Sequence, residues 1–154
     1  MYNSDVINLI LKGVIDMKKE NGIILRKAQL EDIEEIYNLI ATVHENIETK
    51  SWYTYTKKIE RYNLFINDGI SMVACDNGKI VGVYLAYILR DDGTNFYQLV
   101  QDYFKNTDNI IEIINYAVLE NYRGMGLQTQ MLLKVEEILK NKKYKKFVDT
   151  VHHD

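Results

Sequence analysis

The chain has 154 residues, enough for one domain with a core of its own. Hydrophobic residues make up 47% and charged residues 27% of it, as in ordinary globular proteins, and a net charge of −3 argues against a general nucleic-acid binder. The one cysteine excludes an internal disulfide, and no apolar run approaches the roughly 20 residues that a membrane span needs, so we expect a cytoplasmic protein that does not enter membranes.

The first half of the chain contains one strand-like and three helix-like segments. Residues 4–17 have helical spacing, and a natural domain start follows them, so we expect an appended, helical segment over residues 1–16. Residues 22–28 indicate a first strand. Two further helices are predicted over residues 30–40 and 51–66. Their apolar sides hold Leu30, Ile33, Ile36, Tyr37 and Ile40 in the first, and Trp52, Tyr55, Ile59 and Tyr62 in the second.

Two β-rich runs follow within residues 70–89 and are joined by Asn77-Gly78. This dipeptide favours the left-handed backbone of a tight turn, so the pattern predicts a β-hairpin. Cys75 within it is expected to be a small core residue rather than a nucleophile. A short inserted helix is predicted next, with Thr94 as a candidate cap. Its apolar side holds Phe96, Leu99, Val100 and Tyr103.

The last third of the chain indicates a strand, a helix and a strand. Residues 110–119 form an almost unbroken apolar run, which predicts a central strand buried on both faces. Residues 127–140 predict an amphipathic helix, and residues 145–151 a last strand. The whole order, β-α-α-β-β-(α)-β-α-β, predicts a single mixed α/β domain over residues 17–154.

The loop from Arg123 to Gln128 joins this apolar strand to the following helix and contains Gly124 and Gly126. The first N–H groups of a helix have no intrahelical partner, and glycine lets an anion approach them closely. The loop is therefore either a phosphate-binding nest or a plain turn with two convenient glycines. It lacks the Gly-Lys-Ser/Thr of a Walker loop, and it lacks the third glycine and the first-strand position of the dinucleotide fingerprint.

With these residues the sequence resembles the GNAT superfamily of acyl-CoA-dependent N-acetyltransferases. The family's loop reads Arg/Gln-x-x-Gly-x-Gly/Ala, which Arg123 to Gln128 matches up to a final glutamine. Residues 118–124 resemble the family's Val-x-Pro-x-Tyr-Arg-Gly approach, with Glu120 in place of proline. Residues 25–36 resemble its first strand and helix, and residues 76–82 resemble its second hairpin, including Gly82.

The resemblance implies an α/β (α+β) fold with a mixed, mainly antiparallel central sheet flanked by helices. In the family, the strand that matches residues 145–151 is followed by another helix and two more strands, so we expect a fold truncated after its fifth strand. An exposed edge on that strand invites pairing with a second chain, so a homo-oligomer is expected. Alternatively, the N-terminal segment covers the exposed surface.

The resemblance also implies acetyl-CoA as co-substrate and no metal. The main-chain N–H of Val118 is the candidate oxyanion donor. Gln128, where the family has glycine or alanine, could either crowd the pyrophosphate or add an amide contact to it. The expected cofactor-binding residues, acting through loop amides and strand backbone, are Ala117, Val118, Arg123, Gly124, Met125, Gly126, Leu127 and Gln128.

In the family, an amine attacks the thioester directly, and this attack needs a base because a protonated amine is not nucleophilic. Glu112 is the candidate, because some family members carry a glutamate at this offset. It lies six residues before Val118, so a regular strand puts both on one face, whereas a β-bulge would upset that parity. The plainer interpretation is a carboxylate at the wet end of a strand. Tyr116 is the candidate acid, with Tyr122 as an alternative.

These expectations together describe an N-acetyltransferase that transfers an acetyl group from acetyl-CoA to a primary amine of a small molecule or a protein, within a ternary complex. The alternative is a non-catalytic or truncated acyl-CoA-binding module, and a third reading is a structural domain with a coincidental loop. Neither nucleic acid nor a membrane is expected as a partner.

Overall fold

A computed structural model describes residues 22–50, 53–89, 91, 95–104, 110–140 and 146–148. The predicted N-terminal helix, Trp52, the cap at Thr94 and the side chains of Phe96 and Leu99 lie outside the described residues. Within the described ranges, no helix combines the length and the apolar character that crossing a bilayer demands.

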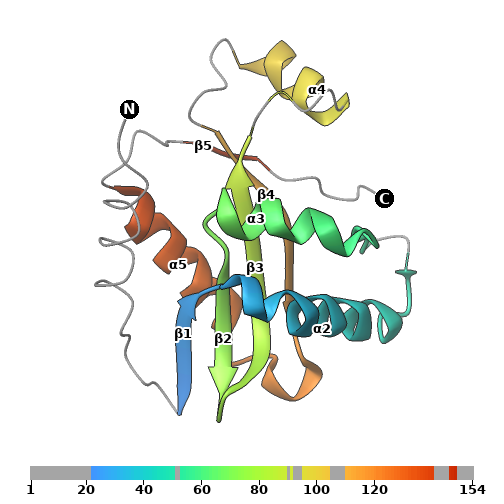
Figure 1. Cartoon of the computed structure of the whole chain (residues 1–154), viewed down its shortest axis with the longest axis vertical. Coiled ribbons are helices and arrows are strands. Elements are labelled where there is room, and N and C mark those ends of the chain that lie inside the picture. Colours follow the sequence, from blue (N-terminus) through green and yellow to red (C-terminus); the bar gives the residue numbers. More distant parts are fainter. Residues whose placement is uncertain are drawn as a thin grey trace.

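The centre of the domain is a five-stranded sheet with the strand order β1-β2-β3-β4-β5 (Figure 1). Neighbouring strands are antiparallel except for β5, which runs parallel to β4. The mixed, mainly antiparallel sheet predicted from the sequence is therefore confirmed. The strands are β1 (Ile23–Lys27), β2 (Met72–Asp76), β3 (Lys79–Ile88), β4 (Ile110–Val118) and β5 (Lys146–Val148).

Helices cover both faces of this sheet. The helices α2 (Ile33–Glu45) and α3 (Tyr62–Asn67) pack on one face, here called the α2 face, while α5 (Leu127–Lys140) packs on the other, the α5 face. The helix α4 (Asn95–Tyr103) lies beyond the end of the sheet, at the top of Figure 1. Short 3₁₀ turns precede α2, α3 and α5, at Leu30–Asp32, Ile59–Arg61 and Glu120–Tyr122.

The strand β3 is buried along almost its whole length because both helix layers pack against it. Its residues 80–87 are all buried, and from Val83 to Tyr87 their side chains enter the two cores alternately. Leu85 belongs to the core of the α2 face together with Ile36, whereas Tyr84 belongs to the core of the α5 face together with Met131. The central strand is therefore β3 rather than the predicted strand over residues 110–119.

The strand β4 is not buried on both faces along its length, as its apolar run predicted. Ile110 and Ile111 are fully buried, but Tyr116 is 40% exposed. The strand β5 pairs with β4 only from Ile110 to Glu112. Within the described part of the sheet, the second half of β4 therefore has an open edge.

The second predicted helix is wrong over its first half. Residues 53–58 are not helical, and the helix begins only with the 3₁₀ turn at Ile59. Tyr53 and Tyr55 pack against the core of the α2 face while Thr54 between them is exposed, which is the alternation of an extended segment. Aromatic and β-branched residues favour extended backbone over helix, and this preference outweighs the helical spacing.

Three side chains predicted on the apolar sides of helices are exposed instead. Leu30 is 44% exposed, Ile59 41% and Tyr103 79%. Leu30 and Ile59 lie in 3₁₀ turns, whose three residues per turn rotate side chains away from the face that a 3.6-residue period predicts. Tyr103 is the last residue of α4, and the next residue, Phe104, packs against the core cluster of Val100 instead.

The Asn77-Gly78 hairpin is confirmed. It joins β2 and β3 as an antiparallel pair, and both turn residues have positive φ angles, 48° at Asn77 and 82° at Gly78. These are the left-handed values for which asparagine and glycine are preferred.

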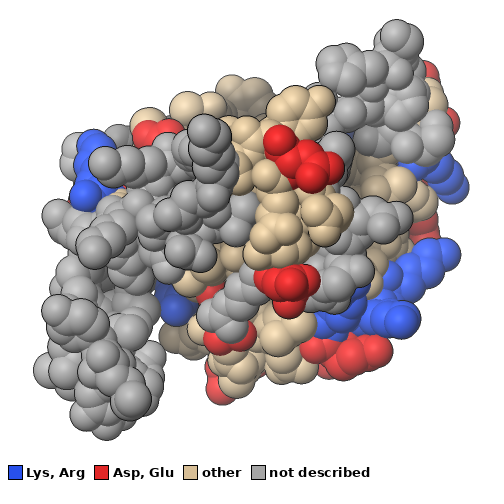
Figure 2. Space-filling view, turned by 90° about the horizontal axis from the view of Figure 1, so that it is seen from above, with Lys and Arg blue, Asp and Glu red and all other residues tan. Residues whose placement is uncertain are grey.

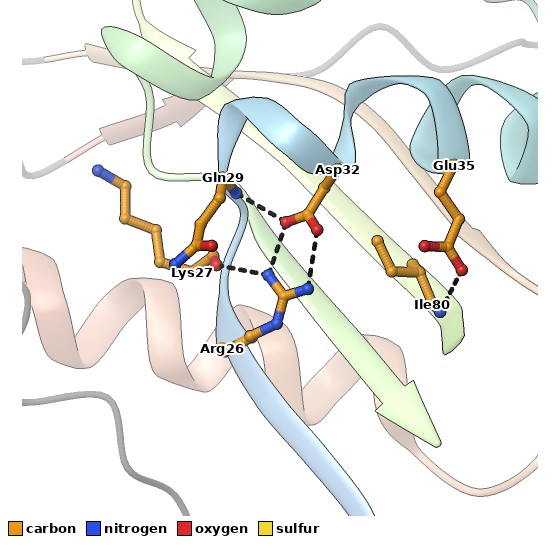
Figure 3. Close-up of polar contacts among 6 residues, drawn as sticks. All are labelled: Arg26, Lys27, Gln29, Asp32, Glu35 and Ile80. Atoms are coloured by element: carbon orange, nitrogen blue, oxygen red, sulfur yellow. Dashed lines mark hydrogen bonds and ion pairs between the residues drawn. The ribbon is translucent and has the colours of Figure 1, made fainter. Parts of the chain in front are cut away.

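An ion pair fastens the start of α2 to β1 (Figure 3). The Arg26 guanidinium donates to both carboxylate oxygens of Asp32, at 2.6 and 2.8 Å, and the Gln29 N–H donates to the same carboxylate at 2.8 Å. One turn into α2, the Glu35 carboxylate accepts a hydrogen bond from the Ile80 N–H at 2.7 Å. The helix is thereby tied to two strands before its apolar side reaches the core.

Charges are mixed on the face that lies at the top of Figure 1. Figure 2 shows acidic side chains set among uncharged residues there, with Lys and Arg toward the right and left edges of the view. This face carries no continuous basic surface over the residues that the structure describes.

Candidate functional site

The loop between β4 and α5 has the backbone of an anion nest. Gly124 and Gly126 have φ angles of 77° and 71°, left-handed values at which a side chain is strained. A Cβ at Gly124 would meet nothing within 4 Å, so the loop is open at this point. The Gln130 N–H donates to Gly126 O at 3.0 Å, the first helical hydrogen bond of α5. The N–H groups of residues 127–129 therefore have no partner within the helix.

Two side chains hold the loop in this conformation. Arg123 Nε donates to Val118 O at 3.3 Å, which ties the start of the loop to the end of β4. Gln130 Nε2 donates to Met125 O at 3.2 Å, which ties its middle to the first turn of α5. Both donors satisfy carbonyl groups and leave the loop N–H groups for a ligand.

The flanks of the loop are also anchored. The Tyr122 hydroxyl donates to Asp76 at 2.8 Å, and this bond raises the pKa of Tyr122. Leu127 is buried in the core of the α5 face, and this burial fixes the start of the helix. Gln128 is exposed in the first turn of α5.

Hydrogen bonding between β3 and β4 decides which main-chain groups of β4 face the open edge. The Leu119 N–H donates to Val81 O at 3.0 Å. Because inward and outward pairs alternate in an antiparallel ladder, the N–H and C=O of Val118 and Tyr116 point away from β3, and those of Ala117 point toward it. The side-chain bonds agree with this assignment of outward-facing groups. The carbonyl of Val118 accepts a hydrogen bond from Arg123 Nε, and the carbonyl of Tyr116 accepts one from the Tyr53 hydroxyl at 3.2 Å.

A β-bulge interrupts β4 just before these residues. Leu85 pairs with Asn115, but the next residue of β3, Ala86, pairs with Ile113. Ile114 is therefore an extra residue on β4, and both it and Asn115 lie toward the α2 face. The alternation of side chains is reversed across this point.

The bulge separates the two candidate catalytic side chains. Glu112 pairs with Tyr87, which packs in the core of the α2 face, and residues directly opposite each other share a face. Tyr116 pairs with Tyr84 and lies with Val118 on the α5 face. The strand is therefore not regular, and of the two alternatives that the sequence left open the β-bulge applies: Glu112 and Val118 lie on opposite faces.

A polar contact at the bulge was not predicted from the sequence. The Tyr53 hydroxyl donates to Asn115 Oδ1, and Asn115 Nδ2 donates to Thr54 O at 3.0 Å. Asn115 is buried, with 7% of its surface exposed. The only signal for it in the sequence is one amide residue inside the apolar run of residues 110–119.

Cys75 and His44 have structural surroundings. Cys75 is buried in the core of the α2 face, where burial raises the pKa of its thiol, so its predicted place in the core is confirmed. His44 lies in the last turn of α2, with its ring centroid 5.1 Å from that of Tyr55. His152 and His153 lie outside the described residues. Over the described ranges, no three His, Cys, Asp or Glu side chains gather as metal ligands do.

A mixed sheet that opens beyond β4, with a glycine loop leading from the open strand into α5, matches the fold of GNAT acetyltransferases. The model of the Acetyltransferase (GNAT) family matches residues 31–154. The chain belongs to this family. No curated protein matches its sequence.

Solved structures share this fold at low sequence identity. A GNAT family acetyltransferase from Brucella melitensis, solved with acetyl-CoA, is 14% identical and aligns over 87% of this chain and 79% of its own, with a TM-score of 0.62. An aminoglycoside acetyltransferase from an uncultured soil metagenomic sample, solved with sisomicin, is 16% identical. It aligns over 88% of this chain and 81% of its own, with a TM-score of 0.59. A ribosomal-protein-alanine N-acetyltransferase from Brucella melitensis biovar Abortus 2308 is 14% identical. It aligns over 86% of this chain and 82% of its own, with a TM-score of 0.57.

Proposed function

We propose that the chain is an N-acetyltransferase that moves an acetyl group from acetyl-CoA to a primary amine within a ternary complex. The proposal is carried by one juxtaposition: an anion nest at the start of α5 directly adjoins the open main-chain edge of β4. Family membership and the similarity to an acetyl-CoA complex support the choice of cofactor.

The two parts of the site suit the two parts of CoA. The N–H groups of residues 127–129 and the helix dipole behind them favour a pyrophosphate. The outward N–H of Tyr116 can pair with a carbonyl of the extended chain of CoA, as one more strand would, and the Val118 N–H is left for the thioester oxygen. The carbonyl groups of Tyr116 and Val118 already accept hydrogen bonds from the Tyr53 and Arg123 side chains. In this proposal Gly124 and Gly126 admit the phosphates, and the exposed Gln128 lies at the rim.

The reaction then proceeds across the edge of β4. The amine nitrogen attacks the thioester carbonyl carbon, and the Val118 N–H donates to the oxyanion that forms. Glu112, on the α2 face, takes the proton of the amine. The C–S bond breaks, and Tyr116, on the α5 face, donates a proton to the leaving thiolate. The amine therefore approaches from the α2 face and CoA from the α5 face.

Calorimetric titration with acetyl-CoA tests the cofactor site. The wild type is expected to bind at micromolar concentration, and an Arg123→Glu and Gly126→Glu double variant is expected to lose binding, because two carboxylates then face the pyrophosphate. A Lys140→Glu and Gln98→Glu double variant makes the same change in net charge at exposed positions of α5 and α4, and should bind as the wild type does.

The pattern of binding decides the outcome. Equal loss in both double variants would mean that net charge, rather than the loop, controls binding. No binding by the folded wild type would refute the cofactor assignment. Binding without acetyl transfer to any of a panel of primary amines would leave an acyl-CoA-binding module.

A further inference from the structure

We propose that Tyr53 and Asn115 form a polar latch that positions the reacting edge of β4, so that both are positioning residues for acyl transfer. This inference depends on the proposed function. The latch joins the segment before α3 to the strand across the bulge, and no part of it touches the glycine loop.

The latch consists of one bifurcated hydrogen bond from the Tyr53 hydroxyl and one hydrogen bond from the Asn115 amide. The Tyr53 hydroxyl donates to Asn115 Oδ1 and lies 3.2 Å from Tyr116 O, and Asn115 Nδ2 donates to Thr54 O at 3.0 Å. Both the acceptor and the donor of the Asn115 amide are thus used, as a buried amide requires. One phenol and one amide connect two segments 62 residues apart.

The position of the latch on β4 gives it an effect on the reacting groups. Asn115 directly follows the extra residue Ile114, so its side chain fixes the strand where its regular pairing has slipped. Tyr116 O is one of the outward carbonyl groups, two residues before the N–H proposed to hold the oxyanion. A hydroxyl on this carbonyl restrains the peptide that leads to Val118.

The latch also links the two sides of the reaction. Tyr53 packs with the core of the α2 face, from which the amine approaches, and its ring lies beside His44 of α2. Burial raises the pKa of the Tyr53 phenol, so it remains a protonated donor at neutral pH. The segment that borders the amine and the edge that holds the thioester are thereby fixed relative to each other.

Loss of the latch should impair turnover and leave cofactor affinity intact. In Tyr53→Phe and in Asn115→Leu, kcat is expected to fall about tenfold or more, because small misplacements of reacting groups are costly. The Kd for acetyl-CoA should stay within about twofold, since the two sites share no contact. The double variant should be no worse than the poorer single variant, because the two residues act as one unit.

Tyr62→Phe is the matched control. The Tyr62 hydroxyl is also held from the same segment, through Thr56 O at 3.4 Å, but within the described residues it makes no hydrogen bond to β4. Its removal should leave kcat unchanged. A similar fall of kcat in Tyr62→Phe, or an unchanged kcat in Tyr53→Phe, would overturn the latch.

Amide hydrogen exchange tests the latch without turnover. Tyr53→Phe should speed exchange at the amides of Asn115 and Ala117, which face β3, by about tenfold or more relative to the wild type, and Tyr62→Phe should not, because local opening controls exchange of hydrogen-bonded amides. If the wild type binds acetyl-CoA but acetylates no amine, the proposed function fails while this readout still judges the latch. Unchanged exchange in Tyr53→Phe would refute it.

Discussion

Glu112 and Tyr116 are only four positions apart in the sequence, yet they lie on opposite faces of β4. A regular strand would put both on one side, where a single substrate would have to contact acid and base together. In the reaction proposed above, their separation would let the proton that leaves the amine and the proton that reaches the thiolate travel on different sides of the sheet.

Replacing Glu112 with glutamine tests its role as base. The variant keeps the shape of the side chain but cannot accept the amine proton, so kcat should fall by about 10²–10⁴-fold. Steady-state kinetics with acetyl-CoA and an accepted amine measure this, and the Kd for acetyl-CoA should not change. Glu120→Gln, an exposed carboxylate near the loop, serves as control. Wild-type turnover in Glu112→Gln would leave Glu112 as a solvated carboxylate at the end of a strand.

At this scale the sequence reveals local chemistry and misses contacts made over distance. Gly124 and Gly126 could be predicted as a nest because a positive φ at a helix start depends on neighbours along the chain. The face of Glu112 could not, because the bulge at Ile114 exists only in the pairing of β4 with β3. Tyr53 and Asn115 find each other only once the sheet and the α2 face are assembled.

Among the elements, α3 and β3 approach most closely at Gly69. A Cβ there would lie 1.9 Å from Phe65 O and 2.4 Å from Ala86 O, both main-chain atoms that cannot yield. Gly69→Ala should therefore lower the free energy of unfolding by about 1–3 kcal/mol, as overpacking does. Urea unfolding followed by circular dichroism measures the change.

Gly82→Ala provides the comparison for Gly69→Ala. Its added Cβ would meet side-chain atoms at 3.4–3.5 Å, which is ordinary van der Waals contact. Its stability should change little. An equal fall in the free energy of unfolding in the two variants would mean that replacing a glycine, and not the close backbone approach at Gly69, causes the effect.

Whether a segment is a helix or a strand follows from the sequence for most elements, but the residues at which each element begins and ends do not. Asn77-Gly78 fixes the hairpin because few other dipeptides adopt its turn. In residues 51–66 the helical spacing of Trp52, Tyr55, Ile59 and Tyr62 competes with a run of aromatic and threonine residues that favours extended backbone. The extended form wins where Tyr53 and Tyr55 can reach the core of the α2 face.

The stability of the whole molecule in acid depends on how its helical layer is joined to the sheet. Burial of Asp32 by itself would raise the pKa of its carboxyl, but the hydrogen bonds from Arg26 and from the Gln29 N–H outweigh it and hold the pKa below the ordinary value of 3.8. The folded state therefore binds this proton less readily than the unfolded state. The resulting stabilisation is complete above pH 3.8 and is lost as the pH falls below it.

Asp32→Asn should lower the free energy of unfolding at pH 7 by about 1–3 kcal/mol, since it weakens hydrogen bonds to a charged group. It should also flatten the loss of stability on acidification below about pH 4, because the group that titrates there has gone. Urea unfolding at neutral and acidic pH measures both effects. Glu137→Gln, which removes an exposed ion pair with Lys134, should leave stability and its pH dependence unchanged. A pH profile of Asp32→Asn parallel to that of the wild type would contradict this account.

The extra residue in β4, Ile114, affects the strand in two ways: through its side chain, and through the number of residues in the strand. The side chain at Ile114 only packs against the core of the α2 face, and another apolar residue can take its place. The number of residues in the strand has a larger effect. Removing one residue here would restore a regular ladder and turn Glu112, and every strand residue before it, to the opposite face. At this position the length of the segment, more than the identity of its residues, specifies which side of the sheet each group serves.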